Sequence, residues 1–236
     1  MTTVAVAILC KTPEPGRSKT RLSPPLHPEE CAGISACFIR DLATTIGRLA
    51  AEGDVTGYAV YTPVGTEARL RELIPASFEI LPQRGDGFGE RLLHGTADLL
   101  ERHRGAILVN SDSPTLPLSI LRAAVDAVKA GDQVVLSPAH DGGYTLIGLS
   151  RLNAGLFDDI PWSTPAVHRL TVERAAQLGL PVVNVPGWYD VDDAASLRLL
   201  EQEFSGQRLP FAEDDGADAP ATRRFLAARG LQRAAR

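Results

Sequence analysis

Residues 4–22 read VAVAILCKTPEPGRSKTRL and join a continuous apolar run to a strongly basic loop. The run from Val4 to Cys10 is rich in Val, Ala and Ile, as expected of a central parallel strand that is covered on both faces. In the loop, two prolines stiffen the chain and Gly16 lets the backbone turn or approach a ligand closely. Such a loop after the first strand of an α/β chain predicts phosphate binding. Its four cations are Lys11, Arg17, Lys19 and Arg21.

The basic loop matches neither of the two best-known phosphate-binding loops. A Walker loop requires the pattern GxxxxGK[ST], whereas Gly16 is followed by RSKT with no glycine beside Lys19. The dinucleotide pattern GxGxxG is also absent after the first strand. We therefore expect phosphate chemistry on a different scaffold.

Strand-like and helix-like segments alternate along the rest of the chain. Apolar residues from Cys31 to Leu49 recur at three- and four-residue steps, which predicts a helix. The alternation predicts a Rossmann-like α/β fold, a three-layer sandwich with a mostly parallel mixed sheet. We expect strands at residues 4–10, 55–62, 78–82, 106–110, 133–137, 144–149 and 181–185. We expect the other helices at residues 65–73, 117–130, 166–178 and 192–204, with one more ending near His103.

The character of the sequence changes after residue 204. An acidic run is followed by several arginines, so we expect residues 1–204 to form a single domain and residues 205–236 to form a tail. A loose, partly disordered tail with one short helix near residues 222–228 is the favoured interpretation. A docking or dimerising arm, which would allow a homodimer, is the alternative.

Composition limits the classes of function. The 236 residues carry a formal net charge of −5, which argues against a general nucleic-acid binder, because such proteins usually display a basic surface. Three cysteines without a CxxC pair are read as buried free thiols rather than disulfides or a metal site. We find neither a signal peptide pattern nor an apolar run of about 20 residues, and expect a soluble, cytoplasmic protein without a membrane partner.

Five unusual segments follow predicted strands. In an open parallel sheet, ligands bind outside the carboxyl ends of the strands, so these segments are expected on one rim. Asp112 stands out, because a lone carboxylate between two serines can offer a hard oxygen ligand to Mg²⁺. A helix-capping role for Ser113, Ser119 or Asp112 itself is the equal alternative. The segments are KTPEPGRSKTRL, RGDGFGER, SDSP, HDGGY and WYDVDD.

A second carboxylate is available near the end of the last strand. Asp190 and Asp192 lie in GWYDVDDAASL, where Asp192 or Asp193 also makes a natural cap for the following helix. One Asp on each of two strand ends could hold Mg²⁺ or Mn²⁺ while the loop cations neutralise phosphate.

Asp141, Gly142, Gly143 and Tyr144 form another candidate segment. By base rate the two glycines form a turn between strands. The functional alternative is that they let a ligand lie against the backbone, with Asp141 and Tyr144 at its edge.

Several long motifs in order resemble a known family. They are VAILCKTPEPGRSKTRL, SDSPTLP, PAHDGGYTLIGL, DIPWSTP and WYDVDDAASL. They look like bacterial transferases on the nucleotide-diphospho-sugar transferase, or glycosyltransferase A, fold that are labelled radical-SAM/selenodomain-associated or arsenosugar-biosynthesis glycosyltransferases. The similarity spans about residues 4–200. More remotely, the chain is similar to phospholactate guanylyltransferases, which activate small phosphorylated acids.

The resemblance implies a nucleotide-binding half followed by an acceptor half. Carried over, the four loop cations would contact the nucleotide phosphates, and Asp112 would bind the metal with Asp190 or Asp192. Residues 85–89, including Gly85, Asp86 and Gly87, would border the base. Residues 141–144 would border the acceptor.

The lone acid in Ser111-Asp112-Ser113 differs from the Asp-x-Asp of many glycosyltransferases of this fold and is closer to nucleotidyltransferases. The first hypothesis is a Mg²⁺-dependent nucleotidyltransferase that joins an NTP to a small phosphorylated acceptor, with Lys19, Arg17 and Asp112 as catalytic residues. Glycosyl transfer from a nucleotide sugar is the alternative. A non-catalytic nucleotide-binding regulator is the alternative from another class.

Overall fold

Strand β1 (Val4–Lys11) lies inside the sheet and pairs in parallel with β2 (Val55–Thr62) on one side and with β4 (Gly105–Asn110) on the other. Its side chains alternate between two apolar clusters, with Val4, Val6 and Ile8 in one and Ala5 and Ala7 in the other. Both faces of β1 are therefore covered, as the unbroken apolar run predicts.

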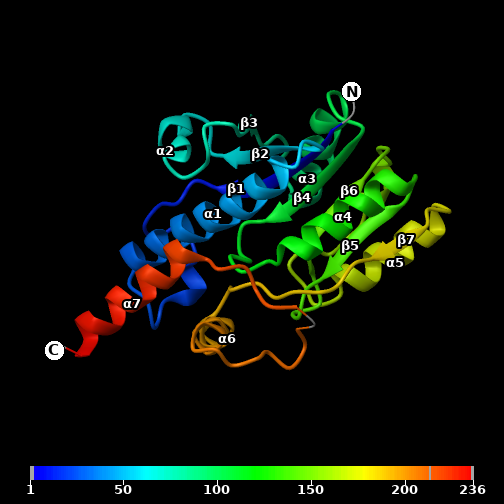
Figure 1. Ribbon diagram of the computed structural model, residues 1–236. Helices are drawn as coiled ribbons and strands as arrows, with labels where there is room; N and C mark the ends of the chain where they lie inside the picture. The colour runs from blue at the N-terminus through cyan, green and yellow to red at the C-terminus, as the bar shows by residue number, and fades with distance from the viewer. Residues whose placement is uncertain (1–2, 213, 235–236) are drawn as a thin grey trace.

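The computed structural model describes residues 3–212 and 214–234, which form a seven-stranded sheet in the order β3-β2-β1-β4-β6-β5-β7 (Figure 1). Strand β6 runs antiparallel to both of its neighbours, whereas the other pairings are parallel. The α/β fold with a mostly parallel mixed sheet is confirmed. The remaining strands are β3 (Glu79–Pro82), β5 (Val134–Pro138), β6 (Tyr144–Leu149) and β7 (Val182–Asn184).

Helices cover both faces of the sheet (Figure 1). One apolar cluster joins β1 to α1 (Pro28–Ala50), α4 (Leu118–Ala130) and α6 (Ala194–Phe204). The other joins the opposite face to α3 (Phe88–Leu100), α5 (Val167–Gln177) and the short helix η2 (Ala154–Phe157). Two small helices complete the core elements, α2 (Glu67–Arg71) and η1 (Thr20–Leu22).

The segment after α6 differs from the loose tail that the sequence favoured. Helix α7 (Pro220–Ala234) lies along α1 (Figure 1), and the buried carboxylate of Asp41 accepts hydrogen bonds from the backbone N–H groups of Ala221 and Thr222 at 2.9 and 2.8 Å. Arg229 pairs with Glu30 at 3.1 Å. The helix expected near residues 222–228 is present but longer, and it lies on α1 as in the docking alternative, because a buried acid in α1 supplies the N-terminal anchor of a helix about 180 residues later. Residues 213, 235 and 236 of this segment lie outside the described residues.

The three cysteines are free and buried, as expected. No described helix has both the length and the apolar character needed to cross a membrane.

Candidate active site

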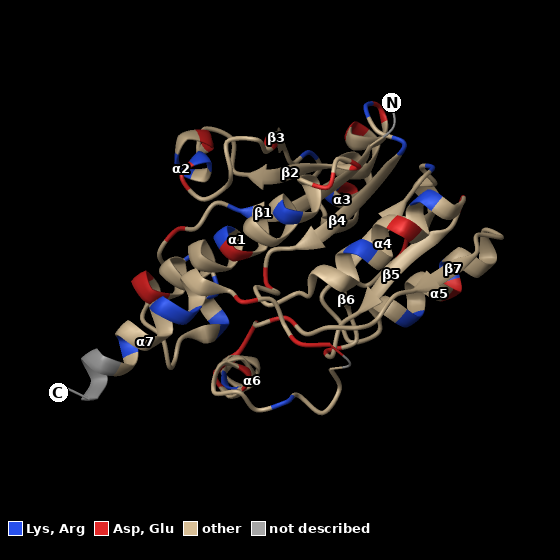
Figure 2. Ribbon diagram, in the orientation of Figure 1, with Lys and Arg blue, Asp and Glu red and all other residues tan. Residues whose placement is uncertain are grey.

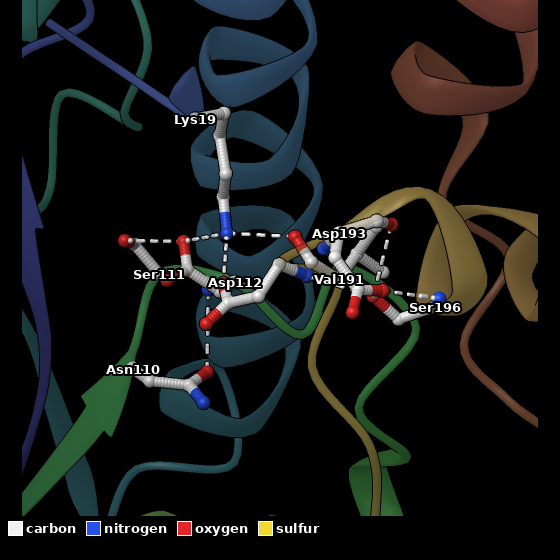
Figure 3. A network of polar contacts seen from close by, with 8 residues as sticks. Lys19, Asn110, Ser111, Asp112, Val191, Asp193 and Ser196 are labelled. Carbon is white, nitrogen blue, oxygen red and sulfur yellow. Dashed lines mark hydrogen bonds and ion pairs between the residues drawn. The ribbon is translucent and has the colours of Figure 1, made fainter. Parts of the chain in front are cut away.

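Lys19 is the central residue of the candidate site (Figure 3). Its ammonium lies 2.8 Å from Oδ1 of Asp112 and 2.7 Å from Oδ1 of Asp192, and it donates a third hydrogen bond to the carbonyl of Val191 at 2.8 Å. All three of its N–H donors therefore have an acceptor. Burial alone would lower the pKa of Lys19, but the two carboxylates raise it, so the side chain is a buried cation.

A tight turn in the basic loop aims Lys19 inward. The backbone N–H groups of Arg17 and Ser18 both donate to the carbonyl of Glu14 at 3.1 Å, and the Ser18 hydroxyl accepts from the N–H of Glu14. Lys19 then adopts a left-handed backbone conformation with φ 49°, which is uncommon for a residue with a side chain. The turn thus sends this one cation toward the acidic loops, whereas Lys11, Arg17 and Arg21 are exposed.

Asp112 follows β4 and is held by its neighbours. The Ser111 hydroxyl donates to Oδ1 of Asp112 at 3.0 Å, and the backbone carbonyl of Asp112 accepts from the N–H of Val191 at 2.9 Å. Helix α4 starts after Pro117 with no side-chain cap, and the Ser119 hydroxyl instead donates to Asp214. The alternative that Asp112 or a neighbouring serine caps this helix is therefore wrong.

The acids after β7 have divided roles. Asp193 caps α6, accepting hydrogen bonds from the N–H groups of Ala195 and Ser196 at 2.9 and 2.8 Å. Because Asp193 serves as the cap, the side chain of Asp192 is left to face Lys19.

Asp190 is half-buried among other acids. Burial, followed by the charges of Asp192, Asp141 and Asp112, raises the pKa of Asp190 to about 7, against the opposing effect of Lys19. The site therefore concentrates four carboxylates around one buried ammonium, and Figure 2 shows the wider distribution of acidic and basic residues.

Two adjoining cavities meet at this cluster. The first, called the basic cavity, has a volume of about 340 Å³ and is lined by Lys11, Arg17, Lys19 and Arg21, with Asp112 and Asp192 at its edge. The second, called the central cavity, has a volume of about 420 Å³ and a mixed lining of carboxylates, aromatic rings and aliphatic side chains. Residues that line both cavities are Arg21, Asp112, Ser163 and Asp192.

The structure brings together most of the residues singled out from the sequence. Asp141, Gly143, Tyr144 and Asp190 line the central cavity. Gly142 is absent from its lining; a Cβ there would lie 2.1 Å from the carbonyl oxygen of Pro165, so this glycine permits a close approach of two chain segments. Gly16 also lies outside both linings, in the turn ahead of Lys19, with φ 72°.

Of the segment 85–89 that was expected to border the base, Phe88 lines the central cavity. Gly85, Asp86 and Gly87 line neither cavity. They precede α3, where the carboxylate of Glu90 accepts hydrogen bonds from the N–H groups of Asp86 and Gly87 at 2.7 and 3.3 Å. The backbone of Asp86 and Gly87 thus has a role in capping α3 that requires no ligand.

Sequence reasoning assigned no role to Trp162, which lines the central cavity together with Phe88. Their rings pack edge to face with centroids 5.3 Å apart. The available signal was the tryptophan in DIPWSTP, an aromatic residue in a proline-rich loop between predicted strands. Trp162 was not selected because its loop lies directly before a predicted helix. The rule that ligands bind outside the carboxyl ends of the strands selects only loops that directly follow a strand.

Asp112 and Asp192 could bind a divalent cation only if the Lys19 ammonium moved away from them. Among residues 3–212 and 214–234, no group of three or more His, Cys, Asp or Glu is arranged to hold a metal ion. Asp112 and Asp192, however, both reach the same ammonium, and Mg²⁺ commonly takes one or two carboxylates plus phosphate and water oxygens. With the ammonium moved away, the carboxylate oxygens of Asp112 and Asp192 would suit Mg²⁺. Because these two residues contact the same ammonium, Asp192 is favoured over Asp190 as the second ligand.

Several solved structures align with this chain over most of its length. A protein of Desulfovibrio desulfuricans G20 proposed to be a nucleotide-diphospho-sugar transferase aligns with a TM-score of 0.82 and 26% identity, over 98% of this chain and 98% of that one. A CTP complex of CMP:2-keto-3-deoxy-manno-octonic acid synthetase aligns with a TM-score of 0.56 and 11% identity, over 86% and 99% of the chains. A cytidylyltransferase from Leptospira borgpetersenii aligns with a TM-score of 0.56 and 10% identity, over 99% and 96%.

No curated protein matches the sequence. A family model described as "uncharacterized protein conserved in bacteria" matches residues 45–164. That segment spans β4, with Asp112 after it, and the loop of Asp141, and it ends beside Trp162. The chain belongs to this bacterial family, DUF2064.

Proposed function

We propose that the protein is a nucleotide-using transferase that moves a nucleotidyl group from an NTP to a small acceptor and releases pyrophosphate. One observation carries the proposal: the buried Lys19 ammonium joins Asp112 and Asp192 at the edge of a cavity that three further cations line. Four cations in one cavity suit a triphosphate, because the leaving pyrophosphate must be stabilised as its charge develops.

In the proposed reaction the oxygen of an acceptor hydroxyl attacks the α-phosphorus and its proton passes to the solvent, while the bond from that phosphorus to the oxygen bridging to the β-phosphate breaks. The electron pair leaves with pyrophosphate. Lys11, Arg17 and Arg21 are placed to hold the β- and γ-phosphates in the basic cavity, and the acceptor approaches from the central cavity. The residues shared by the two cavities mark where the reacting atoms meet.

Asp112 and Asp192 are the proposed ligands of Mg²⁺, with Mn²⁺ as a substitute. When bound, the ion supplies positive charge to the phosphate oxygens. The chain contributes the position of the two carboxylates, fixed by the Ser111 hydroxyl on one side and by the Val191–Asp112 backbone bond on the other.

Glycosyl transfer is the second candidate, favoured by the likeness to the D. desulfuricans protein over nearly the whole of both chains. A thermal-shift panel of NTPs against nucleotide sugars, each with and without Mg²⁺, separates the two. The nucleotidyl proposal expects stabilisation by at least one NTP that depends on Mg²⁺, and stabilisation by a nucleotide sugar alone would overturn it. Equal nucleotide binding with and without Mg²⁺ and no product from any donor would favour a regulator.

Arg17→Gln tests whether the basic cavity binds the NTP. Arg17 is exposed and touches only Glu14, so its loss leaves the fold intact while removing a cation from the basic cavity. Arg151→Gln is the control, because Arg151 is equally exposed and pairs with Asp132 away from both cavities. We expect NTP affinity to fall about tenfold for Arg17→Gln and to stay unchanged for Arg151→Gln.

A further inference from the structure

The two cavities differ sharply in charge. The basic cavity holds the four loop cations, whereas the described lining of the central cavity holds one, Arg21, which also lines the basic cavity. Four carboxylates line the central cavity: Asp112, Asp141, Asp190 and Asp192. A ligand in the central cavity therefore meets mainly negative charge.

Two of these carboxylates carry no compensating cation. Lys19 engages Asp112 and Asp192, and a metal ion would engage the same pair. Asp141 and Asp190 have no ion-pair partner among the residues that the structure describes. Asp141 accepts one hydrogen bond, from the N–H of Gly143 at 2.8 Å, which fixes its carboxylate on the wall of the cavity. The negative charge of Asp141 therefore remains when the metal site is filled.

The rest of the cavity offers contact to an apolar surface. Leu92, Leu108 and Ile147 belong to the buried cluster beneath it. Phe88 is 47% exposed and packs edge to face on the half-buried Trp162, so one aromatic surface remains open to a ligand. A cavity of about 420 Å³ is in the usual range for a small-molecule site.

We propose that the central cavity binds an acceptor without negative charge that presents an aromatic or hydrocarbon face to Trp162 and Phe88. This inference rests on the proposed function in calling the bound molecule an acceptor. It departs from the phosphorylated acceptor expected from the sequence, because a phosphate in this cavity would lie beside the uncompensated carboxylate of Asp141. A neutral or cationic molecule avoids that repulsion, and its apolar face gains burial against the rings.

Trp162 makes the proposal testable without a nucleotide. The chain has two tryptophans, and Trp188 is 2% exposed, so a quencher in the central cavity acts mainly on Trp162. Three probes that share a 4-nitrophenyl ring vary the charge: 4-nitrophenyl phosphate, 4-nitrophenyl β-glucoside and 4-nitrobenzylammonium. Their quenching is titrated at fixed ionic strength, with Trp162→Phe as the control that must lose most of the signal.

We expect the neutral and cationic probes to bind at least about tenfold more tightly than the phosphate probe. Asp141→Asn should reduce severalfold the ratio between the affinities of the cationic probe and the phosphate probe. Asp132→Asn, which removes a carboxylate outside both cavities, should not change it. Tighter or equal binding of the phosphate probe, or no quenching by any probe, would overturn the proposal.

Free nucleosides form the last arm of the test. Displacement of the neutral probe by adenosine, guanosine, cytidine or uridine would assign the cavity to the nucleoside of the donor and overturn the acceptor proposal. If the proposed function is wrong, the result is different: no NTP stabilises the protein in the thermal-shift panel. The two results are therefore distinguishable.

Discussion

The Lys19 ammonium lies 2.7 Å from Oδ1 of Asp192, which is 173 residues away along the chain. The same ammonium is 2.8 Å from Asp112, so one cation neutralises two carboxylates that the proposed function assigns to Mg²⁺. The side chain of Lys19 is only 7% exposed, whereas those of Asp112 and Asp192 are 30% and 42% exposed. Lys19 therefore lies where the proposed function requires a divalent ion.

Lys19→Met should increase the affinity of the nucleotide-free protein for Mn²⁺. Methionine fills similar volume without charge, so two unpaired carboxylates become free to bind the ion. We expect a lower melting temperature without metal, and a larger rise on adding Mn²⁺ than in the wild type. Thermal melts and the amplitude of the free Mn²⁺ electron paramagnetic resonance signal measure the two effects.

Lys11→Met is the control for this variant. Lys11 is an exposed cation of the same cavity whose ammonium contacts only the carbonyl of Arg17, at 3.4 Å. Its loss should leave Mn²⁺ binding without nucleotide nearly unchanged. Equal effects of the two substitutions would show that general charge, rather than the specific position of Lys19, controls metal binding.

Asp112→Asn should abolish turnover while leaving the fold intact. The amide keeps the shape of the side chain and can still accept from the Ser111 hydroxyl, but it loses the charge that a metal ion requires. We expect a fall in kcat of at least about 100-fold in a pyrophosphate-release assay, together with an unchanged circular dichroism spectrum. An active, metal-independent Asp112→Asn protein would disprove the assigned role.

Much of the fold follows from local sequence. The apolar run of β1 and the three- and four-residue spacing in α1 are strong periodic signals, and both elements lie where they were predicted. Strands β1, β4, β5 and β7 run in the same direction, so the loops after them lie on one rim of the sheet. For this reason Lys19, Asp112, Asp141 and Asp190 come close together.

The sequence alone does not predict which cation pairs with which carboxylate in the site. Nothing local distinguishes Lys19 from Lys11; the left-handed backbone of Lys19 and the third acceptor at the Val191 carbonyl decide which cation is buried. Likewise, either Asp192 or Asp193 could cap α6, and only the hydrogen bonds to Ala195 and Ser196 select Asp193. These choices depend on contacts between distant segments.

Glu203→Gln should change how stability depends on pH. Burial raises the pKa of Glu203, while hydrogen bonds from Tyr189 and Thr115 lower it less; the Tyr189 hydroxyl donates to Oε2 at 2.5 Å. The folded protein therefore holds this proton above the ordinary value of 4.5, and stability falls as the pH rises through the raised pKa.

Glutamine has no charge to desolvate and keeps an acceptor for Tyr189. Relative to the wild type, Glu203→Gln should therefore gain stability as the pH rises above 4.5, measured by urea unfolding at several pH values. Glu201→Gln, on the exposed side of α6, is the control. A stability difference that does not vary with pH would mean that Glu203 titrates alike in the folded and unfolded chains.

Asp41→Asn should release α7 from α1. The buried carboxylate accepts from the N–H groups of Ala221 and Thr222 and from the Thr222 hydroxyl at 2.7 Å, and an amide replaces one acceptor by a donor facing these groups. We expect a loss of about 2–4 kcal/mol in the free energy of unfolding. Trypsin should cleave near the exposed Arg223 and Arg224 before the rest of the chain, because the first turn of α7 loses its anchor. Asp126→Asn, at an exposed position in α4, should change neither result, and an unchanged cleavage order in Asp41→Asn would show that the remaining contacts with α1 suffice to anchor the helix.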